Sequence, residues 1–231
     1  MSVISIQAKL TIEDLLAALE QLAPDERDKV LQRLLHLQAR RRTKNIPERE
    51  SRKHIHPLCY LAISGSLRAV SSNASLLRAA ARLAPEGVEI TLYESLADLP
   101  HFNPDLDTDS PPDTVADLRA RLQACDGVLI CSREYVHGVP GSLKNALDWI
   151  VSSGEMMNKP VALIDASLFS KHTEAALVEI LTVMMAKVLP VRIPLSSSRT
   201  DEETVLASVE TRDALRTLIA DLVRTTLEQS N

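Results

Sequence analysis

The chain has 231 residues, of which 45% are hydrophobic and 25% are charged, and its formal net charge is −5. This length is sufficient to bury one α/β core with residues left over. The net negative charge of the main part of the chain gives no case for an extended nucleic-acid-binding surface there, and no apolar run approaches the roughly 20 residues that a membrane-spanning helix needs. We therefore expect neither a nucleic-acid partner nor a membrane span.

The N-terminal sequence predicts a separate helical extension. Apolar residues recur at helical spacing over residues 11–22, after Thr11 as a predicted N-cap, and again in a second stretch that begins at Pro24. We predict a helical hairpin over residues 1–39 and a basic, polar linker over residues 40–57. The linker is interrupted by acidic residues and contains no aromatic residue, so a solvated linker is favoured over an RNA- or lipid-binding segment.

The three cysteines and the N-terminal residues indicate the cellular compartment in which the protein is expected. Cys59, Cys125 and Cys131 are odd in number, lie in or beside apolar runs and lack the spacing of zinc ligands, and the histidines are scattered along the sequence. Buried reduced thiols are therefore favoured over a disulfide or a metal site. The first residues have no basic start, apolar core or cleavage site typical of a signal peptide. We expect a cytoplasmic protein without a metal centre.

Residues 58–231 predict a single α/β domain. Short apolar runs alternate with helical stretches, which indicates βαβ units and a parallel sheet that is covered on both faces. The predicted strands are Leu58–Ser64, Val88–Tyr93, Val128–Ser132, Val161–Asp165 and Val188–Ile193. The predicted helices cover residues 73–84, 113–124, 141–153, 173–186 and 202–228. This count is similar to that of the flavodoxin-like three-layer sandwich, whose strand order is 2-1-3-4-5 and whose ligand lies outside the carboxyl ends of the strands.

The loop after the first predicted strand has the character of a phosphate site. It leads into the N-terminus of a helix, where unpaired N–H groups and the helix dipole favour an anion. Ser66, Ser71, Ser72 and Asn73 add hydrogen-bond donors, and Arg68 adds a forked cation. The alternative is an N-cap serine with a solvent-facing arginine. The loop matches neither the P-loop nor the GxGxxG pattern of dinucleotide-binding folds.

The residues of this loop resemble a family signature. The pattern GSLRxxSxN is similar to that of NADPH-dependent FMN reductases, which include quinone, azo-dye and chromate reductases. The resemblance implies that this loop holds the phosphate of FMN. The matching positions are Gly65, Ser66, Leu67, Arg68, Ser71 and Asn73, and we add their neighbour Ser72 to the expected cofactor-binding residues.

The loop after the third predicted strand carries the second motif. Gly138 and Gly141 allow tight turns and Tyr135 offers a flat face to a ligand, although an ordinary turn with a packing tyrosine is the alternative. The segment resembles the family pattern PEYxxxxPGxLKNALDW, which implies that its backbone binds the flavin ring. The ring-binding residues that follow from this resemblance are Arg133, Glu134, Tyr135, Val136 and Gly138.

Two positions depart from the family pattern. Arg133 replaces the usual proline and Val136 replaces an asparagine found in many members. Arg133 restores a backbone N–H and frees φ, so a looser loop is expected. A guanidinium here also raises the alternative of a contact with the 2′-phosphate of NADPH.

The remaining motif residues leave alternatives open. In SLKNALDW, Lys144 and Asn145 either touch a ligand or have a structural role, and Trp149 is expected to pack. In the third loop, Ser167 fits the family position at the ring edge, but the family's glycine-rich stretch is absent. His172 is expected to be solvated rather than to act as a proton donor. The acidic, proline-rich segment of residues 101–112 is expected to be a mobile rim element.

The resemblance implies an FMN-dependent NAD(P)H oxidoreductase, with NADPH or NADH as donor. Hydride passes to flavin N5, and the electrons pass on to a quinone, free flavin or similar acceptor. No catalytic side chain is predicted, because GxSxG, HExxH and a credible triad are absent. Relatives imply a homodimer or homotetramer. Two alternatives remain: a flavodoxin-type electron carrier, although GSLR differs from [ST]xTGxT, and a non-catalytic flavin-sensing or interaction module.

Overall fold

The computed structural model describes residues 57–68, 70–167, 172–195 and 200–229, together with Ala23 and Glu26. The chain divides into two units, residues 1–45 and residues 46–231, and the elements below belong to the second. The predicted helical hairpin and linker fall almost entirely outside the described residues.

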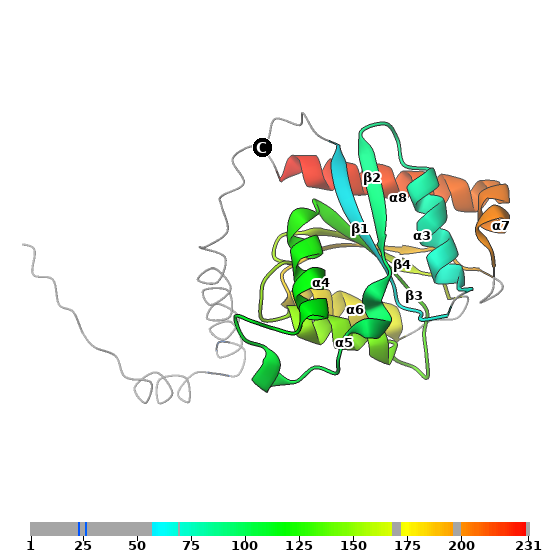
Figure 1. The fold of residues 1–231 in the computed structure, drawn as a ribbon. Coiled ribbons are helices and arrows are strands. Elements are labelled where there is room, and N and C mark those ends of the chain that lie inside the picture. Colours follow the sequence, from blue (N-terminus) through cyan, green and yellow to red (C-terminus); the bar gives the residue numbers. More distant parts are fainter. Residues whose placement is uncertain are drawn as a thin grey trace, which may run out of the picture. The chain divides into compact units, whose positions relative to one another are not determined.

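The core of the second unit is a parallel sheet of five strands in the order β2-β1-β3-β4-β5 (Figure 1). The strands are β1 Leu58–Ser64, β2 Val88–Tyr93, β3 Gly127–Ser132, β4 Pro160–Asp165 and β5 Lys187–Arg192. All four pairings are parallel. The strands lie within one residue of the predicted ranges, and their order is that of the flavodoxin-like doubly wound fold. The predicted fold class is confirmed.

Helices connect the strands, as the alternating pattern predicts. They are α3 Ser72–Arg82, α4 Asp113–Ala124, α5 Gly141–Ile150, α6 Thr173–Val183, α7 Glu202–Ala207 and α8 Val209–Glu228, with short 3-10 helices at Ser95–Asp98 and Pro104–Leu106. The prediction of one helix over 202–228 is wrong. Ser208 has extended backbone, and its hydroxyl accepts a hydrogen bond of 3.2 Å from the N–H of Thr211. Serine is a favoured N-cap, so α8 begins anew there.

Side chains that alternate along the strands form two separate cores. Leu61 and Ile63 of β1 pack with apolar residues of α4, α5 and α6, whereas Tyr60 and Ala62 pack with those of α3, α7 and α8. Successive residues of a strand point to opposite faces of the sheet. A sheet whose strands have apolar residues at both odd and even positions therefore needs a layer of helices on each face. The result is the predicted three-layer sandwich (Figure 1). No helix in the described ranges is both long and apolar enough to cross a membrane.

The register brings three loops to one edge of the sheet. Ser64 pairs with Cys131, and Ser132 pairs with Asp165, so β1, β3 and β4 end side by side. The chain crosses from one side of β1 to the other between β2 and β3, which creates the switch point where doubly wound folds bind ligands. The loops that carry the two sequence motifs therefore meet at this crevice.

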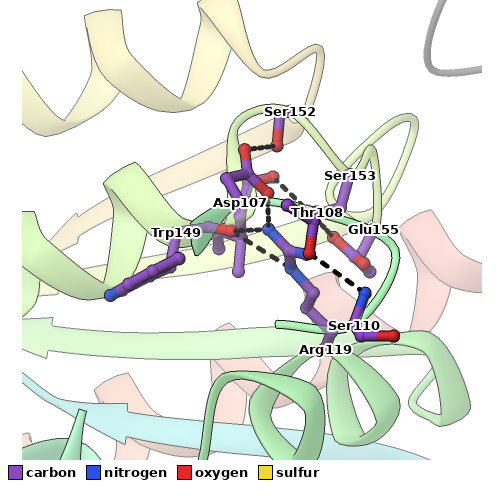
Figure 2. Close-up of polar contacts among 9 residues, drawn as sticks. Asp107, Thr108, Ser110, Arg119, Trp149, Ser152, Ser153 and Glu155 are labelled. Atoms are coloured by element: carbon purple, nitrogen blue, oxygen red, sulfur yellow. Dashed lines mark hydrogen bonds and ion pairs between the residues drawn. The ribbon is translucent and has the colours of Figure 1, made fainter. Parts of the chain in front are cut away.

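The acidic connection of residues 101–112 is held against α5, where the sequence suggested a mobile rim. The guanidinium of Arg119 donates to the carbonyl of Trp149 from Nε and Nη2, and Nη2 also donates to Asp107 Oδ1 at 2.7 Å (Figure 2). The other Asp107 oxygen accepts from the Ser152 hydroxyl at 2.5 Å. The side chains of Arg119 and Asp107 are only 13% and 11% exposed. This network supplies a cation to the C-terminal end of α5, which has no basic residue in its own last turn.

Two residues of the KNALDW motif fasten the start of the same connection. The Asn145 amide donates to the carbonyl of Pro100 at 2.9 Å and accepts from the N–H of Phe102 at 2.8 Å. Trp149 Nε1 also donates to the Pro100 carbonyl, and the Trp149 and Phe102 rings meet edge to face with centroids 5.1 Å apart. These contacts give Asn145 and Trp149 a structural role.

Next to this network, Glu155 is expected to make stability depend on pH. Burial raises the pKa of the Glu155 carboxyl above its ordinary value of 4.5, although the hydrogen bond from the Ser153 hydroxyl acts in the opposite direction (Figure 2). Because the folded chain binds this proton more tightly than the unfolded chain does, the free energy of unfolding falls as the pH rises from about 4.5 through the folded pKa. Glu155→Gln should therefore be more stable than wild type at pH 7 and nearly equal at pH 4. Urea denaturation at both pH values measures this, and a difference that does not change with pH would contradict it.

Candidate functional site

A cleft of about 660 Å³ opens at the carboxyl ends of β1 and β3. It is lined by both motif loops and by the N-terminal ends of α3 and α5. The lining residues are Gly65, Ser66, Leu67, Arg68, Ser71, Ser72, Asn73, Arg133, Glu134, Tyr135, Pro140, Gly141 and Ser142. A cleft at a switch point that is walled by two helix N-termini suits an extended ligand with an anionic group.

The N-terminus of α3 has the character of an anion site. No side chain caps it, and its first turn contains no acidic residue. By contrast, α7 and α8 are capped by Asp201 and Ser208. An uncapped helix end leaves N–H donors without an intrahelical partner, and a phosphate accepts from N–H and hydroxyl donors alike.

The side chains at this helix end are buried as well as polar. Ser71, Ser72 and Asn73 are only 1–3% exposed, and Asn73 Oδ1 has no hydrogen-bond partner among the described residues. Buried polar atoms are nearly always paired. The Asn73 oxygen is an acceptor, so a ligand hydroxyl would satisfy it, while the neighbouring donors would take an anion.

The first loop approaches β3 so closely that its first position requires glycine. A Cβ on Gly65 would lie 2.8 Å from Ser132 Oγ and 3.2 Å from Leu143 Cδ2. Beyond Gly65, the N–H of Ser66 donates to the Ser64 hydroxyl at 3.2 Å, and the N–H of Arg68 donates to the Ser66 hydroxyl at 3.4 Å. These local bonds turn the loop back over the start of α3, which leaves Arg68 at the wall of the cleft.

The Arg133 side chain reaches from the second loop to the first. Its Nη1 donates to Ser72 Oγ at 3.1 Å, and its Nη2 donates to the carbonyl of Leu195 at 3.4 Å. The guanidinium therefore lies beside the N-terminus of α3, at the end of the cleft that has the character of an anion site. The motif predicts Arg133 near the flavin ring or near NADPH, because it gives the position of the backbone and not the reach of the side chain.

The Glu134 side chain caps α6. Its Oε2 accepts from the N–H groups of His172 at 2.7 Å and Thr173 at 3.2 Å, while its own N–H donates to Ser167 Oγ at 2.9 Å. A carboxylate at a helix N-terminus is stabilised by the unpaired N–H groups and by the dipole. Ser167 thus connects the third loop to the second. Because Oε2 is engaged at α6, the ring contact that the family resemblance implies for Glu134 would have to come from its backbone.

Residues 135–138 form a tight two-residue turn with an unfavourable backbone. Tyr135 and Gly138 exchange backbone hydrogen bonds of 3.0 and 3.1 Å, and the two central residues have positive φ, 50° at Val136 and 57° at His137. Turns of this kind favour asparagine and glycine, whereas a β-branched residue at positive φ is strained. The substitution of valine for the family's asparagine therefore has a cost in this turn.

Relieving that strain is expected to stabilise the protein. Val136→Asn should raise the free energy of unfolding by about 1 kcal/mol, because asparagine tolerates the left-handed region. Val151→Asn is the matched control: Val151 is also exposed but has φ −65°, so no gain is expected there. Chemical denaturation of both variants decides the matter. Equal effects of the two substitutions would show that strain at Val136 is not the cause.

The lining of the cleft includes most of the expected cofactor-binding residues: Ser66, Arg68, Ser71, Ser72, Asn73, Arg133, Glu134 and Tyr135. Val136, Gly138 and Ser167 are not among the lining residues; the first two lie in the turn, and the Ser167 hydroxyl accepts from the N–H of Glu134. Three further lining residues, Pro140, Gly141 and Ser142, were not among those expected. Their position at the start of a predicted helix could have indicated them, but the motif was interpreted only as a binding site for the flavin ring.

Comparison with known proteins identifies the family. The family described as NADPH-dependent FMN reductase matches residues 60–200, a range that contains both motifs, strands β2 to β5 and most of β1. The chain belongs to this family. Both motif loops and the cleft between them lie inside the matched range, so the family assignment and the geometry concern the same site.

Individual relatives agree with the assignment. An NADH:(hydroxy)cinnamate reductase subunit from Vibrio ruber is 39% identical over 126 residues, and a quinone reductase from Escherichia coli is 34% identical over 111 residues. These alignments cover 53% and 47% of this chain, and only 61% and 59% of the relatives. Among solved structures, the flavoenzyme NAD(P)H:(acceptor) oxidoreductase FerB from Paracoccus denitrificans has a TM-score of 0.57 at 26% identity. That match covers 74% of this chain and 98% of FerB.

Proposed function

We propose that this FMN reductase family member is an FMN-dependent NAD(P)H oxidoreductase that reduces a quinone, free flavin or similar small acceptor. The observation that supports this most is the uncapped N-terminus of α3, whose buried polar residues line a 660 Å³ cleft between the two family motifs. The named activities of the reductase relatives point in the same direction.

The residues present fit the parts of FMN. At the α3 end, the donors of Ser71 and Ser72 and the cations of Arg68 and Arg133 suit the phosphate, and the unpaired Asn73 oxygen suits a ribityl hydroxyl. At the other end, Tyr135 and the backbone of the second loop suit the isoalloxazine ring. When bound, FMN supplies a ring that accepts hydride from NAD(P)H and passes electrons on. The protein contributes binding, orientation and a positive electrostatic environment, which agrees with the lack of a predicted catalytic side chain.

The rim of the cleft suits an apolar acceptor. Leu67 and Tyr135, which line the cleft, are 56% and 74% exposed, and Val70 and Val136 in the same two loops are 60% and 88% exposed. Exposed apolar residues gathered in one place mark binding surfaces more often than chance. A planar, weakly polar molecule such as a quinone matches this surface better than a charged acceptor does.

Steady-state and anaerobic assays of the FMN-loaded protein test the function. We expect rapid NADPH or NADH oxidation with excess quinone, ping-pong kinetics, and full bleaching of the bound flavin by one equivalent of donor. A flavin that neither donor reduces would refute the reductase and favour an electron carrier or a flavin-sensing module. Comparing kcat/KM for the two donors also settles which one the enzyme prefers.

The same apolar rim is the surface on which we place a second copy of the chain. A homo-oligomer would cover Leu67 and Val70, which are exposed in the single chain. Sedimentation of the full chain and of Leu67→Ser measures this: a dimer or tetramer that the substitution weakens supports the assembly, and a monomeric wild type refutes it.

A further inference from the structure

Three side chains with metal-ligating atoms gather beside the cleft, and the proposed flavin chemistry needs none of their ligand atoms. Glu134 and His137 come from the loop after β3, and His172 immediately precedes α6. Each offers one ligand atom, and these atoms all lie within 4.8 Å of one another. We propose that Glu134, His137 and His172 bind a divalent transition-metal ion of the zinc type.

The spacing suits such an ion. His137 Nδ1 lies 3.2 Å from Glu134 Oε1, and two ligands of a tetrahedral zinc ion are separated by about 3.4 Å at ordinary bond lengths. The rings of His137 and His172 meet edge to face, with centroids 5.0 Å apart. Both histidines are exposed, so small rotations of their side chains bring the third ligand atom into range without moving the core.

The carboxylate is already oriented for this role. Glu134 Oε2 is held by the N–H groups of His172 and Thr173, which turns Oε1 toward His137. The Thr173 hydroxyl also donates to the carbonyl of Gly138 at 2.8 Å, which ties the turn to α6. Fixed second contacts of this kind orient the ligands of metal sites and add to their affinity. Here they preset the carboxylate in relation to both histidines.

The donor set selects the class of ion. Two imidazoles and one carboxylate suit zinc, nickel or copper, whereas magnesium and calcium favour oxygen ligands alone. An ion pair explains the contact between Glu134 and His137, and the cap that Glu134 provides for α6 brings the backbone of His172 close. Neither contact requires the ligand atom of the His172 ring to converge with the other two, and this convergence supports the metal. The expectation of no metal centre rested on cysteine spacing and on histidines scattered along the sequence, two of which the fold brings together here.

Zinc titration of the full chain tests the proposal. The chain is prepared without a polyhistidine tag, stripped with EDTA, and titrated with Zn²⁺ against a chromophoric chelator. We expect His137→Ala and His172→Ala each to weaken binding of one Zn²⁺ by at least about 10-fold to 100-fold, the loss that is typical when even an outer partner of a metal ligand is removed. His101→Ala is the control, because His101 is an exposed histidine outside the cluster, and it should bind zinc as wild type does.

The double variant His137→Ala/His172→Ala distinguishes this site from the other histidines, since it retains four of the six in the chain. We expect it to bind one Zn²⁺ fewer than wild type and to lose the visible absorption of Co²⁺ bound at the site. The same zinc stoichiometry and affinity in wild type and the double variant would overturn the proposal. FMN titration and thermal melting of the variants verify that they fold, so a loss of zinc binding is not mistaken for unfolding.

Discussion

Replacing Arg119 with methionine is expected to destabilise the protein by about 3 kcal/mol, because it breaks a nearly buried ion pair and removes the cation that balances the Asp107 carboxylate. Asp107 would lose its cation, and the carbonyl of Trp149 would lose the two guanidinium donors (Figure 2). Methionine retains most of the apolar stem of arginine, so the change concerns polar contacts rather than volume. Chemical denaturation with fluorescence of Trp149, the single tryptophan, measures the loss.

A second arginine on the same helix provides the control. Arg121 pairs with Asp117 at 2.8 Å, but both side chains are about half exposed, and exposed ion pairs contribute little. Arg121→Met should therefore leave the unfolding midpoint almost unchanged. If both variants lost the same stability, the position of Arg119 in a buried network would not be the reason. Limited proteolysis within residues 101–112 should also accelerate in Arg119→Met alone, because the network holds that connection.

Replacing Arg133 with alanine is expected to weaken FMN binding by about 10-fold to 100-fold. This is the loss that corresponds to one hydrogen bond from a charged group, which contributes about 1.5–3 kcal/mol. The guanidinium lies at Ser72, beside the uncapped N-terminus of α3. Its effect should therefore be on the phosphate. Riboflavin, which lacks the phosphate, should bind to wild type and to Arg133→Ala with nearly equal affinity. Quenching of flavin fluorescence measures all four affinities.

The control for Arg133 is Arg78→Ala, because Arg78 is an exposed residue of α3 outside the lining of the cleft. It should leave FMN affinity unchanged. The ratio of kcat/KM for NADPH over NADH distinguishes the remaining alternative. An Arg133→Ala variant with normal FMN affinity and a lost preference for NADPH would assign this residue to the 2′-phosphate and contradict its role at the FMN phosphate.

The fold was predictable because its signals are local and repeated. Short apolar strands alternate with amphipathic helices, and the sheet order follows from the βαβ pattern and the family resemblance. The break at Ser208 was missed because the apolar periodicity continues through it, while the cap that starts α8 depends on a single hydroxyl. Apolar periodicity alone does not show where the hydrogen bond of one serine hydroxyl interrupts a helix.

The site was predictable as a pair of loops, but its side-chain contacts were not. The motifs located the residues around the cleft, since each follows the carboxyl end of a buried strand. Nothing in the sequence indicated that Glu134 caps α6 or that Arg119 reaches the carbonyl of Trp149, because these contacts join residues 30 or more positions apart. Such contacts depend on tertiary packing, which leaves no periodic trace.

Titration of the wild-type protein with FMN and with riboflavin tests the central claim most directly. If the cleft binds FMN through a phosphate site at the start of α3, FMN should bind at least about 10-fold more tightly than riboflavin, which corresponds to the loss of one charged contact or more. Equal affinity for the two flavins, or no binding of FMN, would contradict a phosphate site at this helix end.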